Sequence, residues 1–270
     1  MKFLRKINRC RICKSKDVVR VLNLGQTPIG ENFKKKKLND GLFDLNLQQC
    51  KKCGLCQIED VIDPKILYKD YLYQSNSSNY LIKHFDNYSK QVSKFLKLEK
   101  KSLILDIGSN DGMLLSKFKK YGFKCLGIEP AKKIAKVAND RNIKTINSFF
   151  DNKTTNLILK KYKKISVVTA NNVLANIDDI HSWFKNIKKI ITNEGFFVFE
   201  SFYLRDVIKN KVLDFIYHEH LSIFSVKCIK YLCKLHDLKL INVEAVNTKG
   251  GSLRYYVCSK NHKSKINNSI

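Results

Sequence analysis

Two pairs of cysteines near the start of the chain carry the clearest chemistry in the sequence. Cys10 and Cys13 form one C-x-x-C pair, and Cys50 and Cys53 form a second. Two such pairs place four thiolates around one ion, which is the tetrahedral set that structural zinc prefers. Because four protein ligands leave no open coordination position, we predict that Zn²⁺ has a structural role here and not a catalytic one.

Cys56 leaves a second register open, since Cys53 and Cys56 are also spaced C-x-x-C. We favour Cys50 with Cys53, because Gly54 follows directly and suits the tight turn that directs backbone amides at the sulfurs. The alternative is that these residues are reduced cysteines packed in a small core. The other cysteines lack a partner spacing and are expected to be buried small hydrophobes: Cys125, Cys228, Cys233 and Cys258.

A polar, glycine-containing turn over 106–112 follows a predicted buried strand and precedes a predicted helix. Ligands bind at such turns in open α/β sheets, and Gly108 and Gly112 let the backbone come close to a ligand. Asn110 stands where the dinucleotide pattern G-x-G-x-x-G requires its second glycine, which argues against a pyrophosphate site. Asp106 can hold the turn or accept a hydrogen bond from an ammonium group.

An acidic residue, Glu129, ends the next predicted strand. A carboxylate at this place can accept both ribose hydroxyls of an adenosine. Taken alone, the turn and the acid could be a turn glycine and a surface carboxylate. Their order within a series of strands favours S-adenosylmethionine as the cofactor of a methyltransferase. Asn171 and Asn172, which follow the fourth predicted strand, are further candidates for contact with the cofactor.

The segment Tyr217-His-Glu-His220 places three ionisable side chains beside a phenol. It is not the H-E-x-x-H pattern of zinc proteases, and His218 with His220 lacks an evident third metal ligand. Hydrogen bonding within a loop is the alternative to a chemical role. We favour acid–base chemistry, because histidine titrates near neutral pH and Glu219 can orient it.

Apolar strands alternate with amphipathic helical stretches from residue 99 onwards, which predicts an α/β fold with a mostly parallel, Rossmann-like sheet. The predicted strands are 103–107, 124–129, 144–149, 165–170 and 195–200, and the predicted helices are 80–98, 113–121, 131–139 and 178–191. A closing antiparallel hairpin is predicted over 238–246 and 253–258. We expect a zinc-binding domain over 1–66, a helical linker and active-site segment over 67–98, a cofactor-binding core over 99–260 and a tail over 261–270.

The net charge of +27 could indicate a nucleic-acid partner, but lysine supplies nearly all of it. Proteins that read bases tend to use arginine for bidentate contacts, so we expect no specific nucleic acid. No apolar run reaches the length of a membrane helix, and the charged start does not resemble a signal peptide. We therefore expect a cytoplasmic protein without a membrane partner, in which nine cysteines are not a disulfide framework.

Together these motifs resemble the zinc-binding sugar C-methyltransferases, which are class I, S-adenosylmethionine-dependent enzymes that act on nucleotide-linked 4-keto-deoxysugars. The resemblance covers nearly the whole chain. The segments that carry it are Cys10-x-x-Cys13, Leu24-Gly25 with Thr27-Pro28, Cys50-x-x-Cys53-Gly54-Leu55, Asp106-Ile-Gly-Ser-Asn-Asp-Gly112, Tyr217-His-Glu-His220 and Gly250-Gly-Ser-Leu-Arg254.

The resemblance implies roles for particular residues. His220 is the base that removes a proton next to the ketone, with Glu219 and Tyr217 beside it, and Tyr73 reaches the sugar. Asn176 stands where the family usually has an active-site histidine, so an acid–base role at that position is lost. The family also continues past the Gly-Gly-Ser-Leu-Arg strand, so we expect the C-terminal substrate domain to be missing from these 270 residues or to be supplied by a separate chain.

Two other functions remain open. One is an O- or N-methyltransferase of another small molecule, which would need no base at His220. The other is a cofactor-binding or nucleic-acid-binding remnant without turnover, for which steep salt dependence of RNA binding would be the sign. C-methylation beside a ketone of a nucleotide-linked deoxysugar is the leading hypothesis.

Overall fold

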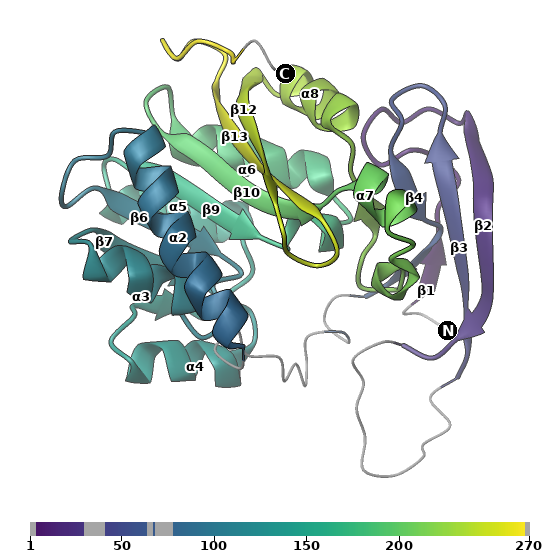
Figure 1. Ribbon diagram of the computed structural model, residues 1–270, viewed down its shortest axis with the longest axis horizontal. Coiled ribbons are helices and arrows are strands. Elements are labelled where there is room, and N and C mark those ends of the chain that lie inside the picture. Colours follow the sequence, from purple (N-terminus) through teal and green to yellow (C-terminus); the bar gives the residue numbers. More distant parts are fainter. Residues whose placement is uncertain (1–3, 30–40, 64–66, 68–77, 268–270) are drawn as a thin grey trace.

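The computed structural model describes residues 4–29, 41–63, 67 and 78–267 of the chain. A seven-stranded sheet with the order β12-β13-β10-β9-β6-β7-β8 lies at the centre of the larger unit (Figure 1). Its strands are β6 (Leu103–Ile107), β7 (Lys124–Ile128), β8 (Thr145–Ile146), β9 (Val167–Asn171), β10 (Phe196–Phe202), β12 (Leu238–Val246) and β13 (Ser252–Ser259). The five strands from β10 to β8 are parallel, and β13 is antiparallel to both β10 and β12. The mostly parallel sheet and the closing hairpin are therefore confirmed.

Alternate residues of the central strands face two different hydrophobic clusters. In β6, Ile104 packs into one cluster while Leu103 and Leu105 belong to the other. In β9, Val167 packs into the same cluster as Ile104, and Val168 packs into the same cluster as Leu105. Side chains of a strand point alternately to opposite faces, so apolar residues at every position require helices on both sides of the sheet.

Seven α-helices are found among the described residues: α2 (Asn79–Phe95), α3 (Met113–Lys120), α4 (Lys132–Asp140), α5 (Asn152–Lys161), α6 (Ile180–Ile191), α7 (Leu204–Lys209) and α8 (Val226–Leu235). In α2, Phe85, Tyr88 and Val92 recur at helical spacing and cover one face of the sheet together with α3. Helices α6 and α8 contribute to the cluster on the other face. None of the helices in these residues is long and apolar enough to cross a bilayer.

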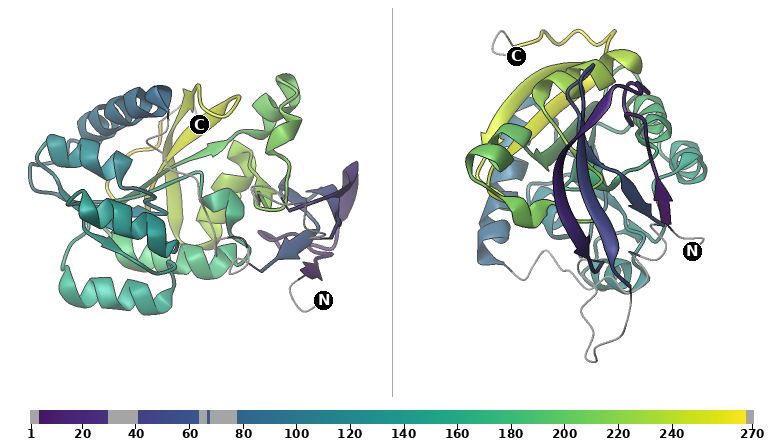
Figure 2. Two further views of the ribbon diagram at one scale, coloured as in Figure 1. Left: turned by 90° about the horizontal axis from the view of Figure 1, so that it is seen from below. Right: turned by 90° about the vertical axis from the view of Figure 1, so that its right-hand side faces the viewer.

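The N-terminal part forms two small antiparallel sheets, β1-β5 and β11-β4-β3-β2. Its strands are β1 (Leu4–Lys6), β2 (Val18–Thr27), β3 (Phe43–Cys50), β4 (Cys56–Ile58) and β5 (Asp60–Ile62). The fourth strand of the second sheet, β11 (Ser222–Ile223), comes from the far end of the chain and pairs with β4. Figure 2 shows the purple N-terminal strands beside the green segment that contains α7 and β11. The N-terminal unit is therefore joined to the larger one by a shared sheet.

The third strand is shorter than the sequence predicts. The prediction covers 144–149, whereas β8 contains Thr145–Ile146 alone. The following residues form a loop that ends at Asp151, whose side chain caps α5 by accepting a hydrogen bond from the Thr154 backbone N–H at 2.7 Å. Helices α5, α7 and α8 were not predicted at all. Their apolar faces are short and are interrupted by lysines, so periodicity alone did not reveal them.

Candidate functional site

Four cysteines come together in the N-terminal unit, from two turns that are forty residues apart in the sequence. The sulfurs of Cys10, Cys13, Cys50 and Cys53 all lie within 4.8 Å of one another. The Cys10–Cys53 and Cys13–Cys50 sulfur distances are both 3.4 Å. Zn–S bonds of about 2.3 Å in a tetrahedron place sulfurs about 3.8 Å apart, so this cluster fits zinc after a small expansion. No second group of metal-ligating side chains gathers in the parts of the chain that the structure describes.

Both cysteine turns have the same backbone shape. The residue after each pair, Lys14 or Gly54, has a positive φ, 59° and 78°. Each donates its N–H to the carbonyl of the first cysteine of its pair, at 3.0 Å for Lys14 and 2.9 Å for Gly54. Cys56 lies outside the cluster. The cluster therefore contains Cys50 and Cys53, the pair that we favoured because Gly54 follows it.

The cofactor turn is held against the second strand of the sheet. Gly108 and Ser109 both donate their N–H groups to the carbonyl of Ile128, at 2.8 and 3.0 Å. Gly108 has φ +65°, and a Cβ at this position would lie 2.5 Å from the Cγ2 atom of Val173. Glycine is therefore required here by the backbone conformation and by the close approach of a cavity-lining loop.

Glu129 joins the cofactor turn to the residues that follow its own strand. One carboxylate oxygen accepts the N–H of Asn110 at 3.0 Å, and the other accepts the N–H of Ala131 at 2.8 Å. Burial raises the pKa of Glu129, and the two backbone hydrogen bonds oppose that shift. Each carboxylate oxygen can accept a second hydrogen bond, so the fixed carboxylate fits a ribose diol.

Asp106 lies behind the turn and is only 4% exposed. It accepts a hydrogen bond from the Thr169 hydroxyl at 2.6 Å, and burial raises its pKa to about 7. Asp106 is not among the residues that line the cavity described below, and neither is Gly112, whose Cβ position lies 2.9 Å from Ile143 Cγ2. Asp106 and Gly112, the first and last residues of the predicted cofactor turn, therefore support the turn without lining the cavity.

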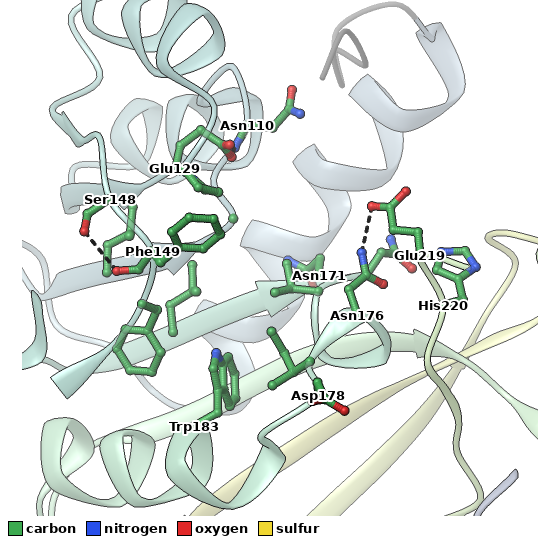
Figure 3. Close-up of a pocket in the computed structure, with 18 of the residues that line it drawn as sticks. Asn110, Glu129, Ser148, Phe149, Asn171, Asn176, Asp178, Trp183, Glu219 and His220 are labelled. Atoms are coloured by element: carbon green, nitrogen blue, oxygen red, sulfur yellow. Dashed lines mark hydrogen bonds between the residues drawn. The ribbon is translucent and has the colours of Figure 1, made fainter. Parts of the chain in front are cut away.

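A cavity of 780 Å³ opens between β6 and β9, where the order of the strands in the sheet reverses, at the carboxyl ends of the strands. Glu129 and Phe149 lie at one end of it and Glu219 and His220 at the other, with Asn176 between them (Figure 3). The predicted site residues that line it are Gly108, Asn110, Glu129, Asn171, Asn172, Tyr217, Glu219 and His220. Tyr73, the remaining predicted residue, lies outside the described part of the chain.

Asn171 and Asn172 border the cavity between its two ends. The Nδ2 atom of Asn171 and the Oδ1 atom of Asn172 are buried and have no hydrogen-bond partner among the described residues. Buried polar atoms normally have partners, so these two are suited to a polar ligand. The polar lining of this part of the cavity is compatible with S-adenosylmethionine.

An aromatic wall beside Glu129 was not predicted from the sequence. Phe149 and Phe150 follow β8, and Phe150 packs against Trp183 of α6 with ring centroids 5.4 Å apart. Phe149 remains 42% exposed although it is a large apolar side chain. The sequence signal for this wall was the pair of aromatic residues directly before Asp151, which caps α5. The predicted strand over 144–149 was too long and included Phe149, so the pair was not recognised as part of a loop.

His220 is buried and neutral. Its Nδ1–H donates to the carbonyl of Phe215 at 2.8 Å, which leaves Nε2 as an acceptor that faces the Tyr217 hydroxyl at 3.4 Å. Burial, with a contribution from the positive charge of Lys249, lowers the pKa of His220 to about 3. An uncharged imidazole with a lone pair on Nε2 is the protonation state that a base requires.

The neighbours of His220 have different partners. Glu219 accepts a hydrogen bond from Asn176 Nδ2 at 2.9 Å, as the dashed line in Figure 3 shows. Asn176 thus orients a carboxylate at the position where the resemblance implies a histidine. His218 points away from the cavity, with its Nε2 donating to the Asp44 carbonyl of β3 at 3.1 Å. The two histidines therefore do not form a common metal site.

The strand order 3-2-1-4-5-7-6, counted from β6 as the first strand, and the cavity at its switch point define a class I methyltransferase. Residues 80–243 match the family described as methyltransferase domain, and residues 10–68 match a family described as zinc-binding domain. The chain belongs to the S-adenosylmethionine-dependent methyltransferases that carry an N-terminal zinc-binding domain.

Among curated proteins, the chain is 30% identical over 254 residues to the C-methyltransferase NovU of Streptomyces niveus. The match covers 93% of this chain and 60% of that relative's length. Among solved structures, the PH0226 protein of Pyrococcus horikoshii OT3 has a TM-score of 0.54 at 15% identity, over 72% of this chain and 99% of that one. Magnesium protoporphyrin IX methyltransferase of Synechocystis PCC 6803, solved with bound S-adenosylhomocysteine, has a TM-score of 0.51 at 12% identity, over 72% and 91%. The two structures support the fold alone.

Proposed function

We propose that this protein transfers a methyl group to a carbon atom next to a ketone, and that its substrate is a nucleotide-linked deoxysugar. The observation that carries the proposal is a buried His220 that lines the same cavity as Glu129, with Nδ1–H held on the Phe215 carbonyl and Nε2 left as an acceptor beside Tyr217. A C-methyltransferase among the relatives supports the reaction type. The sugar nucleotide rests on the motifs that resemble the sugar C-methyltransferases.

A carbon next to a ketone becomes a nucleophile only when it loses a proton. His220 Nε2 takes that proton, and the electrons of the C–H bond form an enolate. S-adenosylmethionine supplies an electrophilic methyl group, so that a C–C bond forms, a C–S bond breaks and S-adenosylhomocysteine leaves. His220 then releases its proton to solvent. Glu219, which Asn176 orients, lines the same cavity and precedes His220 in the sequence.

Each end of the cavity has its own role in this proposal. Glu129 accepts the ribose hydroxyls, Phe149 contacts the adenine, and Asn171 and Asn172 hold the polar part of the cofactor. Asp106 supports the turn from behind. The four-cysteine cluster holds zinc as a structural ion, since no coordination position is left for substrate. The abundance of free cysteines suits a reducing compartment, so we place the reaction in the cytoplasm.

Cofactor binding is tested by calorimetry with S-adenosylhomocysteine. Removal of two hydrogen bonds to a charged group costs about 3 kcal/mol, so Glu129→Ala should weaken binding about 100-fold. Glu99→Ala, which removes an exposed carboxylate, should leave the affinity unchanged. Equal affinity in the two variants would refute the ribose contact.

The reaction type is tested with nucleotide-linked 4-keto-deoxysugars in D₂O. With S-adenosylhomocysteine bound, the wild type should exchange the hydrogen next to the ketone for deuterium, and with S-adenosylmethionine it should add one methyl group to that carbon. His220→Asn should abolish both processes, whereas His218→Asn should retain them because His218 does not line the cavity. Methyl transfer to oxygen or nitrogen that survives in His220→Asn would replace this proposal with an O- or N-methyltransferase.

A further inference from the structure

The turn between β12 and β13 reaches into the same cavity as the Tyr217–His220 segment. Thr248 and Lys249 of this turn line the cavity together with Tyr217, Glu219 and His220. They directly precede the motif Gly250-Gly-Ser-Leu-Arg254. Their position on the substrate side of the cavity makes them candidates for the chemistry.

The turn is held rigidly from one side by α7 and the residues that follow it. Gly250 and Gly251 both have positive φ, and Cβ atoms on them would lie 2.7 Å from Val212 Cγ2 and 2.5 Å from Asp206 Cβ. Asn210 Nδ2 donates to the Gly250 carbonyl at 2.7 Å. A tightly packed turn fixes the point from which its side chains extend, which favours preorganised contacts.

The side chain of Lys249 reaches the Phe215 ring, which neighbours His220. Its ammonium lies 5.6 Å from the centre of the Phe215 ring, and that ring is nearly parallel to the His220 imidazole with centroids 6.0 Å apart. The charge of Lys249 is close enough to lower the pKa of His220. The Thr248 hydroxyl is buried and has no hydrogen-bond partner among the described residues. A cation and a free hydroxyl donor therefore border the place where His220 acts.

We propose that Lys249 is a catalytic residue that stabilises the enolate oxygen formed when His220 removes the proton, and that the Thr248 hydroxyl donates to the same oxygen. This inference rests on the proposed C-methylation. The C–H bond breaks, its proton goes to His220 Nε2, and the displaced electron pair of the ketone resides on oxygen. Lys249 keeps its proton throughout and donates a hydrogen bond. Methyl transfer then restores the ketone.

The charges explain why this arrangement favours the transition state over the bound ketone. Before the reaction, the ammonium of Lys249 disfavours a second positive charge on His220. Once the enolate forms, its negative charge attracts both the Lys249 ammonium and the protonated His220. This attraction offsets the repulsion between the two cations. An interaction that strengthens as charge develops raises kcat and leaves ground-state binding nearly unchanged.

The experiment compares Lys249→Met and Lys249→Arg with Lys260→Met, which removes an exposed lysine after the same hairpin. Hydrogen–deuterium exchange next to the ketone is followed by NMR with S-adenosylhomocysteine bound, and kcat and KM are measured for methyl transfer. Lys249→Met should lower the exchange rate and kcat about 10²- to 10³-fold, with KM changed less than about threefold. Lys249→Arg should recover part of the rate, and Lys260→Met should match the wild type.

Several results would overturn the inference. A raised KM with unchanged kcat and exchange would mean that Lys249 binds the diphosphate of the substrate instead. A lowered melting temperature or a loss of S-adenosylhomocysteine affinity in both Lys249 variants would indicate a structural role. If hydrogen–deuterium exchange is unchanged in Lys249→Met but abolished in His220→Asn, Lys249 has no role in enolate formation and the proposed function stands. If the wild type neither exchanges nor methylates any ketone, the proposed function fails as well.

The histidine itself gives a readout that needs no turnover. Removal of the Lys249 charge should raise the pKa of His220, which NMR titration of the imidazole nitrogens can measure without substrate. Lys260→Met should not move it. An unchanged His220 titration in Lys249→Met would show that the ammonium is not close to the base, and the inference would be withdrawn.

Discussion

Replacement of Arg11 by methionine tests how the zinc cluster is connected to the active site. Arg11 lies between Cys10 and Cys13 in the sequence, and its side chain is 3% exposed. One of its terminal nitrogens donates to the carbonyls of Ile58, at 2.9 Å, and Leu221, at 3.2 Å. Leu221 directly follows His220. One side chain therefore links the first cysteine turn to the Tyr217–His220 segment.

The same guanidinium makes an ion pair at the edge of the cavity. Its Nε atom lies 3.2 Å from Asp178 Oδ1, and Asp178 lines the cavity. Removal of one partner from a buried pair costs about 3–5 kcal/mol. We take the lower end, because Asp178 is 27% exposed and retains Arg5 as a second partner. A loss of about 3 kcal/mol corresponds to a fall in melting temperature of roughly 6–12 °C for a chain of this size.

Differential scanning calorimetry of the zinc-loaded protein measures this fall, with Arg9→Met as the control. Arg9 is exposed and two residues away, so its replacement should change the stability by no more than about 0.5 kcal/mol. In Arg11→Met, hydrogen exchange next to the ketone should drop because the carbonyl of Leu221 loses one of its two hydrogen bonds and keeps only that from the Ile58 N–H, while S-adenosylhomocysteine affinity should persist. The reasoning is refuted if Arg11→Met melts and exchanges like Arg9→Met.

Three further predictions concern groups with unusual environments. The pKa of His220 is lowered to about 3 by burial, so its contribution to stability is complete above about pH 6.5 and is lost as the pH falls towards 3. Between pH 7 and 5 the wild type should lose about 2 kcal/mol more than His220→Gln in urea unfolding, and equal losses would contradict the burial argument. Asp106→Asn should not lower the unfolding free energy at pH 7.5, because burial raises the pKa of Asp106 to about 7 and its charge is therefore unfavourable. The same variant should bind S-adenosylhomocysteine about tenfold more weakly by calorimetry if the carboxylate attracts the methionine ammonium, and unchanged affinity would exclude that contact. Metal analysis should find one zinc per chain in Cys56→Ser and almost none in Cys53→Ser, and the reverse result would assign the other register.

Local sequence patterns predicted those parts of the protein that neighbouring residues determine. The buried strand 103–107 and the glycine turn after it were recognisable because apolar runs and glycines act within a few residues. The two C-x-x-C pairs were recognisable because ligand spacing within a turn is fixed by the backbone. The position of Asp106 behind the turn could not be recognised in this way, because its contact with Thr169 joins two strands that are far apart in the sequence. Similarly, no local pattern shows that Lys249 borders the same cavity as His220.

The division of the chain into a zinc-binding domain and a separate catalytic core is also a local interpretation, and the contacts between them argue against independence. β11 begins two residues after His220 and completes the sheet that contains β4. His181 of α6 donates through Nε2 to the carbonyl of Ile12, between the first two cysteines, at 2.7 Å. Apolar side chains of the cysteine turns and of α8 belong to one continuous cluster. A sheet, a histidine and a buried arginine thus connect the metal site to the segment that contains His220. Loss of zinc should therefore disturb His220 before it disturbs Glu129, which lies at the other end of the cavity, so turnover should be lost at a lower chelator concentration than cofactor binding.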